Sequence, residues 1–279
     1  MIVAALLAAA ALAAAAAAAK PQPATLLAAG DIASCGSRGD EQTAALLEGQ
    51  PGMIAALGDI LYDGSYDTCY AWAAVKQRTR PALGNHDYED GGAAYFAYWG
   101  ARFGRDPQHG WYSYGLGGWH VVVLNSNCSI VACAAGSEQE RWLRADLRAH
   151  RRLCTLAYWH HPRFSSGRHG SQEATAPLWA ALQAARAEVV LVGHDHDYER
   201  FAPQTDAGVR DAAHGIREFV VGTGGKSMYP FTRQPLANSL VRADVYGVLK
   251  LRLLPRSYRW QFLAVEGSSF ADSGSGRCR

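Results

Sequence analysis

Short apolar runs that end in metal-binding side chains recur along this sequence. Five of them close with AAGD, ALGD, ALGN, AYWHH and LVGH, and four of the five place a glycine directly before the polar residue. The carboxyl ends of strands in an open α/β sheet line one crevice, so these side chains should converge in space. The glycines are expected to let the backbone turn sharply over that crevice.

The pattern of apolar residues predicts one α/β domain over residues 24–279, with a β-rich C-terminal part and no linker that would separate domains. Helices are expected at 40–48, 93–103, 137–150 and 176–187, the third opened by a capping box of Ser137 and Glu140. Strands are expected at 25–29, 53–57, 81–83, 153–159, 188–192 and 219–221. Hairpins are expected at 111–124, turning at Gly117-Gly118, and over the alternating tail from 245 to 267.

The first nineteen residues, MIVAALLAAAALAAAAAAA, contain no charge. They predict a signal peptide over 1–19, cleaved near its end, and therefore a secreted or periplasmic protein with no stable membrane association. The stretch lacks the usual positive start, so an uncleaved membrane anchor is the alternative, although alanine is weakly apolar and the stretch is barely long enough to span a bilayer.

Six cysteines follow this leader, and their even number favours disulfides in an oxidising compartment. None forms a C-x-x-C pair, which argues against a thiolate zinc site or a redox motif. Sequence alone cannot fix their connectivity. Cys128 with Cys133 is the most plausible local pair, and the remaining pairs are taken as Cys35–Cys69 and Cys154–Cys278.

Composition and charge argue against nucleic acid as a binding partner. The chain has 279 residues, is 49% hydrophobic and 19% charged, and carries a formal net charge of +2. Its basic residues are scattered rather than clustered, which gives no sign of a nucleic-acid surface. We therefore expect a globular protein that acts on small molecules and has no nucleic acid as a structural partner.

The side chains gathered at the strand ends are suited to binding two metal ions. Seven of them are candidate ligands: Asp31, Asp59, Tyr62, Asn85, His160, His194 and His196. Seven donors are too many for one tetrahedral zinc and suit two metals that share a bridging carboxylate. Oxygen and imidazole donors without a thiolate indicate iron, manganese or zinc. Polar loops that merely cap a sheet would not need metal-binding residue types at every turn.

The motif order GD, GDxxY, GNHD, H and GHxH resembles the calcineurin-like metallophosphoesterases, specifically their purple acid phosphatase branch. The resemblance extends from Gly30 to about Gly225. Most members of the superfamily have a histidine two residues after the first aspartate, where this chain has Ala33. The purple acid phosphatases instead use a tyrosine, and Tyr62 occupies that place. The resemblance implies an α/β fold of two packed mixed β-sheets flanked by helices, a four-layer αββα sandwich.

The resemblance also assigns the candidate ligands to two sites. The first metal, typically Fe(III), would be held by Asp31, Asp59, Tyr62 and His196. The second, typically Zn, Mn or Fe(II), would be held by Asp59, Asn85, His160 and His194. Asp59 would bridge the two ions, and each histidine of the GHxH motif would serve one of them.

The other histidines divide into two groups by the same resemblance. His169 would protonate the leaving group and His86 would position the phosphate, while His161 would be a non-ligand. For His109, His120, His150 and His214, which have no counterpart, a surface or core role is expected. The segment VVGTGGKS, residues 220–227, is not a phosphate-binding P-loop, because Val220 stands where glycine is required and no helical pattern follows.

The implied function is a secreted binuclear-metal phosphoesterase that hydrolyses small phosphate monoesters by in-line attack of a metal-bound hydroxide, as acid phosphatases do. Two alternatives stay open at this point. One is a phosphodiesterase or nucleotidase with the same two-metal chemistry. The other, of a different class, is a non-catalytic metal-binding or interaction protein that keeps only the fold.

Overall fold

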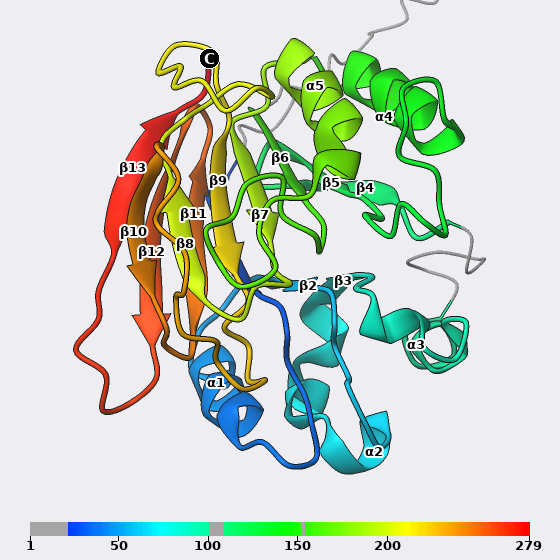
Figure 1. The fold of residues 1–279 in the computed structure, drawn as a ribbon, viewed down its shortest axis with the longest axis vertical. Helices are drawn as coiled ribbons and strands as arrows, with labels where there is room; N and C mark the ends of the chain where they lie inside the picture. The colour runs from blue at the N-terminus through cyan, green and yellow to red at the C-terminus, as the bar shows by residue number, and fades with distance from the viewer. Residues whose placement is uncertain (1–21, 101–108, 152–153) are drawn as a thin grey trace, which may run out of the picture.

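Two β-sheets lie face to face in the computed structural model, which describes residues 22–100, 109–151 and 154–279 (Figure 1). The six-stranded sheet has the order β13 (Ser273–Arg277), β12 (Ser257–Ala264), β11 (Gly247–Leu254), β1 (Ala24–Ala29), β2 (Met53–Leu57) and β3 (Thr79–Ala82). The seven-stranded sheet has the order β10 (Ser239–Ala243), β8 (Tyr198–Phe201), β9 (Arg217–Val221), β7 (Val189–Val192), β6 (Cys154–Tyr158), β5 (Trp119–Val123) and β4 (Tyr112–Leu116). Both sheets mix parallel and antiparallel pairs.

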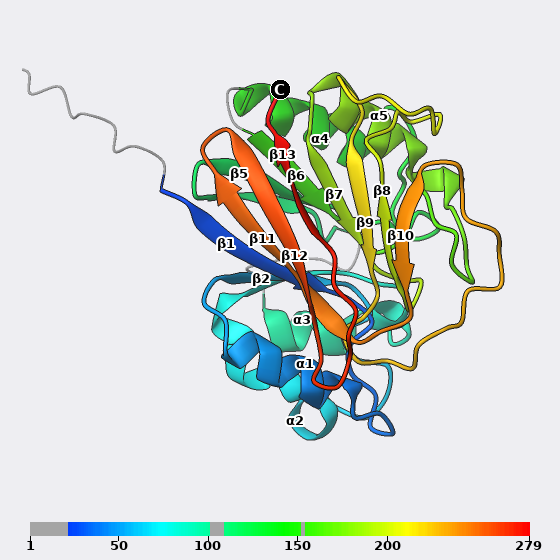
Figure 2. The ribbon, with the colours of Figure 1, turned by 90° about the vertical axis from the view of Figure 1, so that its left-hand side faces the viewer.

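The helices flank the two sheets. In Figure 2, α4 and α5 lie on the side of the seven-stranded sheet, whereas α1, α2 and α3 lie below the six-stranded sheet. The α-helices are α1 (Gly39–Glu48), α2 (Tyr66–Cys69), α3 (Ala93–Trp99), α4 (Glu138–Ala149) and α5 (Ala176–Ala184). Short 3₁₀ helices occupy Ala71–Arg78, His86–Tyr88 and Glu173–Thr175. The expected fold class, two packed mixed sheets with flanking helices, is confirmed.

Alternating side chains of β5 explain why the layers stack in this way. Trp119, Val121 and Val123 face the core between the two sheets, while Val122 faces the second core beneath α4 and α5. A strand that is apolar on both faces can be covered on both sides, as is usual for the parallel strands of α/β proteins. The run WHVVVL therefore places β5 in an interior layer.

Most expected elements are present, with shifted ends. Half of the capping box of α4 forms: the Ser137 hydroxyl accepts the Glu140 N–H at 3.3 Å, but the Glu140 carboxylate accepts from the N–H of Gly136 rather than from that of Ser137. The strand expected at 81–83 is 79–82, and the helix expected at 176–187 ends at Ala184. Residues 1–19, 101–103 and 153, on which expectations were also placed, lie outside the described residues. Among the helices that are described, none is long and apolar enough to cross a bilayer.

The strand β13 was missed because its sequence, SGSGR, contains none of the residues that favour strands. The structure gives the physical reason for its glycines. A Cβ atom on Gly274 would lie 2.3 Å from the Trp260 ring, and one on Gly276 would lie 2.3 Å from the Tyr258 ring. These glycines leave room for the aromatic side chains of β12, which is the neighbouring strand. The short strands β8 and β10 were also missed.

All three expected disulfides are present, and every cysteine is paired. Cys35–Cys69 joins the loop after β1 to α2, and Cys128–Cys133 closes a short loop after β5. Cys154–Cys278 joins the start of β6 to the end of the chain. The two longer connections tie together segments that are distant in sequence.

The ends of the parallel strands of both sheets are held together by backbone hydrogen bonds. The N–H of Gly30, after β1, donates to the carbonyl of Val221 in β9 at 2.9 Å. The N–H of Gly224 returns a bond to the Gly30 carbonyl at 2.8 Å. The two sheets therefore meet at the edge where β1, β2, β3, β6 and β7 deliver their polar side chains.

We predict that removing the Cys154–Cys278 disulfide lowers the free energy of unfolding by about 2–5 kcal/mol, because cross-linking a long loop restricts the unfolded chain. The two cysteines are separated by 124 positions. The test is urea denaturation of the double variant Cys154→Ala/Cys278→Ala under oxidising conditions.

The matched control is Cys128→Ala/Cys133→Ala, whose cysteines are only 5 positions apart and whose disulfide should contribute less. Equal losses in the two double variants would contradict this account.

Candidate metal centre

Three predicted ligands, Asp31, Tyr62 and His196, meet at one point. The Tyr62 hydroxyl donates to Asp31 Oδ1 at 2.9 Å and also lies 2.9 Å from His196 Nε2. His196 Nε2 is 3.4 Å from Asp31 Oδ1. The other ring nitrogen of His196 lies 2.7 Å from the Ser227 carbonyl and must carry a proton to donate to it. In the neutral ring, Nε2 is left with a lone pair directed at this point.

A second group contains Asp59, His160 and His194. His160 Nε2 lies 3.3 Å from Asp59 Oδ2 and 3.2 Å from His194 Nδ1. The Nδ1 of His160 lies 2.9 Å from the Leu57 carbonyl, which again leaves Nε2 as the coordinating atom of the neutral ring. Asn85 lies between Gly84 and His86, which both approach Asp59. Its side-chain oxygen is buried and has no hydrogen-bond partner. An orphaned amide oxygen is the expected state of a ligand whose cation is not included.

These spacings fit the coordination of a cation. Ligand atoms about 2.1 Å from a metal lie about 3.0 Å apart in octahedral geometry and about 3.4 Å apart in tetrahedral geometry. The measured separations in the two groups run from 2.9 to 3.4 Å. Asp31, Asp59 and His160 also offer ligand atoms that all lie within 4.8 Å of one another, which joins the two groups. The donor set therefore fits neighbouring metal ions, as a binuclear centre requires.

The electrostatics of the site also favour cations. Asp31 is fully buried and Asp59 is 1% exposed. Burial alone would raise the pKa of both carboxyls, but nearby imidazoles, chiefly His196 for Asp31 and His160 for Asp59, lower them. Burial likewise works against a charged His160, but the two carboxylates raise its pKa to about 9. In the absence of metal, protonated histidine thus supplies the positive charge that the aspartates require.

Burial and the same two carboxylates raise the pKa of the Tyr62 phenol far above its usual value. The phenol therefore stays protonated until a cation offsets the negative charge of the aspartates. The electrostatics of the site therefore favour a cation over a further anion.

The backbone places three of the ligands in an unusual conformation. Asp31, Asp59 and His194 have positive φ angles of 59°, 48° and 71°. Non-glycine residues rarely adopt this left-handed region, and clusters of such residues are typical of functional sites. The expectation that the preceding glycines make the turns is wrong for three of the four positions. Of these glycines, only Gly58 has a positive φ, at 85°.

The other glycines are needed because the chain approaches the ligands closely. A Cβ atom on Gly84 would lie 2.0 Å from Asp59 Oδ1, and one on Gly193 would lie 2.6 Å from Asp31 Oδ2. Backbone N–H groups then reach the carboxylates: His86 donates to Asp59 Oδ1 and His194 donates to Asp31 Oδ2, each at 2.8 Å. These contacts fix the orientation of both aspartates.

His169, the candidate proton donor, lies beside the second group. Its ring centroid is 4.5 Å from that of His194 and 5.6 Å from that of Tyr229. The fully buried Asp195 holds its loop, accepting the N–H groups of His169 at 2.6 Å and Gly170 at 3.1 Å. Asp195 stands between the two histidines of the GHxH motif, and its role was missed in the sequence although its alternation with them was visible.

His86, the candidate phosphate-positioning residue, lies on the other side of the site. Its ring is 4.4 Å from that of Tyr62, and its Nδ1 is 2.5 Å from Glu89 Oε1. The buried Asp87 shapes this turn, because it accepts the N–H groups of Gly84 at 2.8 Å and Ile60 at 3.0 Å. The two candidate catalytic histidines therefore approach different metal groups.

The structure also brings further residues to the edge of the site. His161 was expected to be a non-ligand, but it offers a nitrogen within 4.8 Å of those of His160 and His194. Its Nδ1 lies 2.9 Å from the hydroxyl of Ser126, and burial together with the charge of His160 lowers its pKa to about 3. Tyr229 stacks on His196, with ring centroids 4.1 Å apart. No spacing rule in the sequence would have identified Ser126 and Tyr229.

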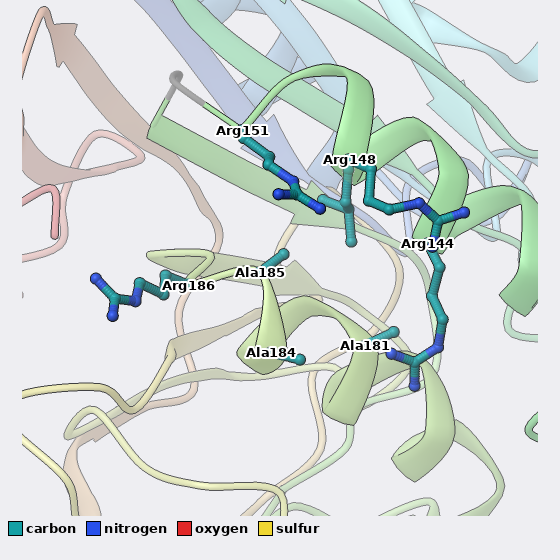
Figure 3. Close-up of a pocket in the computed structure, with 8 residues that line it drawn as sticks. Arg144, Arg148, Arg151, Ala181, Ala184, Ala185 and Arg186 are labelled. Carbon is teal, nitrogen blue, oxygen red and sulfur yellow. The ribbon is translucent and has the colours of Figure 1, made fainter.

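Two pockets help to locate the chemistry. A pocket of about 200 Å³ borders the centre and is lined by both Tyr62 and His86, with Asp63, Glu89 and Asp90 also on its wall. A pocket of about 460 Å³ lies instead between α4 and α5 (Figure 3). It is lined by Arg144, Arg148, Arg151 and Arg186 together with Leu147, Ala181, Ala184 and Ala185. Its arginines lie toward the C-terminal ends of α4 and α5, where positive charge is favourable. Because none of its lining residues is a usual metal ligand, this second pocket is not part of the metal centre.

We predict that Gly84→Ala weakens metal binding on the order of 10–100-fold, the loss that follows when groups that orient a ligand are disturbed. The added Cβ would displace Asp59, which it would approach to 2.0 Å. Metal retained per chain should be measured after dialysis against a chelator, with thermal melting to detect unfolding.

Gly36→Ala is the matched control, because a Cβ atom there would meet nothing within 4 Å. Unchanged metal retention in folded Gly84→Ala would show that Asp59 does not depend on this close approach.

Comparison with known proteins agrees with this geometry. A family model described as calcineurin-like phosphoesterase matches residues 6–198, more than half of the chain. The chain is 28% identical to purple acid phosphatase 21 of Arabidopsis thaliana over 221 residues, covering 71% of this chain and 49% of that protein. It is 33% identical over 100 residues to a probable purple acid phosphatase 20 of the same plant, covering 33% of this chain and 23% of that protein. The chain thus spans about half, or less, of the length of these curated relatives.

Solved structures show the same fold. A purple acid phosphatase from yellow lupin (Lupinus luteus) superimposes with a TM-score of 0.76 at 15% identity, covering 92% of this chain and 54% of that one. A Plasmodium protein described as the anchor in the inner membrane complex superimposes with a TM-score of 0.71 at 14% identity, covering 92% of this chain and 90% of that one. With the family match and the site geometry together, the chain belongs to the calcineurin-like phosphoesterases and is similar to the purple acid phosphatases among them.

Proposed function

We propose that this protein is a metal-dependent phosphatase that hydrolyses small phosphate monoesters at a binuclear centre. The single observation that carries the proposal is the approach of the two ligand groups, since Asp31, Asp59 and His160 offer ligand atoms within 4.8 Å of one another, with the orphaned oxygen of Asn85 as a further donor. Such a pair of sites suits in-line displacement at phosphorus. Membership of the phosphoesterase family supports the same reaction class.

In this proposal, Asp31, Tyr62 and His196 hold the first metal, Asn85, His160 and His194 hold the second, and Asp59 bridges them. Two bound cations would lower the pKa of a water molecule and neutralise charge on the ester. The phenol of Tyr62 and its oxygen-rich surroundings suit iron(III) at the first position, with zinc, manganese or iron(II) at the second. A tyrosinate ligand to iron(III) would colour the protein.

The chain itself would orient the ester and move the proton. His169 lies next to His194 and is held through its backbone by Asp195, so its ring can reach a leaving oxygen on that side. Burial lowers the pKa of His169, so its protonated form is a stronger acid but is populated mainly at acidic pH. His86, fixed against Glu89, would bind phosphate oxygens from the side of Tyr62.

The pocket beside the centre favours an ester with a single phosphate. Its wall carries the carboxyl groups of Asp63, Glu89 and Asp90 and the rings of Tyr66 and Tyr95. A leaving group that bears further phosphates would place negative charge against these carboxylates. This observation supports a monoesterase over a nucleotidase that acts on nucleoside di- or triphosphates, and a diesterase remains the alternative within the same chemistry.

A secreted or periplasmic location is part of the proposal. Three disulfides link the described residues, and disulfides persist in oxidising compartments. The different-class alternative is a binding protein without turnover. The Plasmodium protein that shares this fold is described as an anchor, so the fold by itself does not establish catalysis.

We predict that Asp59→Asn lowers turnover of a chromogenic phosphate monoester on the order of 10³-fold, since it weakens a bridge that supports several kcal/mol of metal catalysis. Initial rates on a monoester and on the matching diester should be compared in the wild type and the variant. The control variant is Asp67→Asn, which replaces an exposed carboxylate outside the site.

Fast monoester hydrolysis that disappears in Asp59→Asn would support the proposal. A preference for the diester would move the function to the alternative. If neither ester is hydrolysed by metal-loaded protein, the catalytic assignment is wrong.

We predict that His169→Ala lowers the turnover number for an alkyl phosphate by about 10²–10⁴-fold, the usual contribution of general acid help. The loss should be much smaller for a nitrophenyl phosphate, because that leaving group departs without a proton. Steady-state rates on both esters test this, with the exposed His214→Ala as control. Equal losses on the two esters would argue against proton donation by His169.

A further inference from the structure

A second cluster of metal-binding side chains, His120, Asp146 and His150, lies outside the binuclear centre. His120 is in β5, whereas Asp146 and His150 are one turn apart at the end of α4. Each offers one ligand atom, and the three atoms all lie within 4.8 Å of one another. The cluster joins a strand of the seven-stranded sheet to the helix that covers it.

His120 points into this cluster without being satisfied by it. The residue is 2% exposed, and its Nε2 is only 2.8 Å from Asp146 Oδ2. Even so, neither ring nitrogen of His120 nor that oxygen has a hydrogen-bond partner, which means that the close pair is not aligned as a hydrogen bond. Buried polar atoms without partners are rare, and a missing ion is one of the standard reasons for them.

Hydrogen bonds to Asp146 and His150 leave one donor atom of each residue available to an ion. The Ser113 hydroxyl donates to Asp146 Oδ1 at 2.9 Å, which leaves Oδ2 free toward His120. The Nδ1 of His150 lies 2.8 Å from the Asp146 carbonyl and 3.4 Å from Asp146 Oδ1. If Nδ1 donates to that carbonyl, the tautomer is fixed and the neutral ring keeps its lone pair on Nε2.

The cluster is separate from the binuclear centre. His120 pairs with Thr155 across β5 and β6, and His160 lies five residues beyond Thr155. At about 3.3 Å per residue, the two sites are about 16 Å apart along the strands. They therefore have no residue in common.

We propose that His120, Asp146 and His150 form a third metal site that binds Zn²⁺ and ties the end of α4 to β5. Two imidazoles, one carboxylate and a solvent molecule make a usual four-coordinate zinc set. The side chain of His150 is 40% exposed, which gives the ion a route in and the ring freedom to turn. Ligand atoms in a tetrahedral zinc site lie about 3.4 Å apart, so zinc binding requires the His150 ring to turn out of its stack on His120 and direct Nε2 at the ion.

A hydrogen-bonded clamp without metal is the competing explanation. In that case Asp146 would simply accept from both histidines, whose rings are stacked with centroids 4.1 Å apart. The misaligned pair of His120 and Asp146 argues against it, since a clamp would be stabilised by an aligned bond. The two explanations differ in whether zinc changes the protein.

The test is a zinc titration of metal-depleted full-length protein in competition with a chromophoric chelator, with the melting temperature followed in parallel. His150→Gln is the principal variant because its side chain is partly exposed, and Asp146→Asn is the second. His214→Gln, which alters a histidine with a 67% exposed side chain outside the cluster, is the control.

We expect the wild type and His214→Gln to bind a third equivalent of zinc. In His150→Gln and Asp146→Asn, the affinity for that equivalent should fall at least 10-fold. Phosphatase turnover should be unchanged in His150→Gln, so the result does not depend on the proposed function. If the four proteins bind the same number of equivalents and show the same zinc-dependent melting shift, the cluster is a clamp and the proposal is overturned.

Discussion

The negative charge of two buried aspartates, Asp31 and Asp59, is the constraint on which the rest of this structure depends. Buried charges are costly unless they are paired and hydrogen-bonded. Backbone N–H groups of His194 and His86 satisfy one oxygen of each carboxylate, and the remaining oxygens face imidazole and phenol groups. Two cations, as the family implies, would complete the balance at the edge where the strand ends of both sheets converge.

Holding these groups in place requires a rigid frame. Three ligands stand in left-handed backbone conformations, each of which costs free energy that neighbouring contacts must offset. The frame is the pair of sheets, joined at this edge by the bonds between Gly30, Val221 and Gly224. Gly84 and Gly193 let the chain pass so close to the aspartates that no side chain fits there. The same arrangement that strains the loops therefore fixes the ligands.

The sequence predicted the parts of the site that follow from strand topology. Any parallel sheet brings its carboxyl ends to one edge, so the donors after β1, β2, β3, β6 and β7 could be grouped before their distances were known. The left-handed turns at Asp31 and His194 could not be predicted, because they depend on packing against the other sheet. The contact of Ser126 with His161 joins distant loops, and β13 is a strand only because its glycines lie over Trp260 and Tyr258.

The order of strands in the six-stranded sheet has a consequence for how the protein folds. The strand β1 lies between β2 and β11, and Ala24 pairs with Leu253. The strand β1, which ends two residues before Asp31, therefore lacks one neighbour until the residues of β11 have been synthesised. Such distant pairings close slowly and leave edges exposed to aggregation in the meantime. We expect the polypeptide to need protection during synthesis, and its ions to load only after the last strands have joined the sheet.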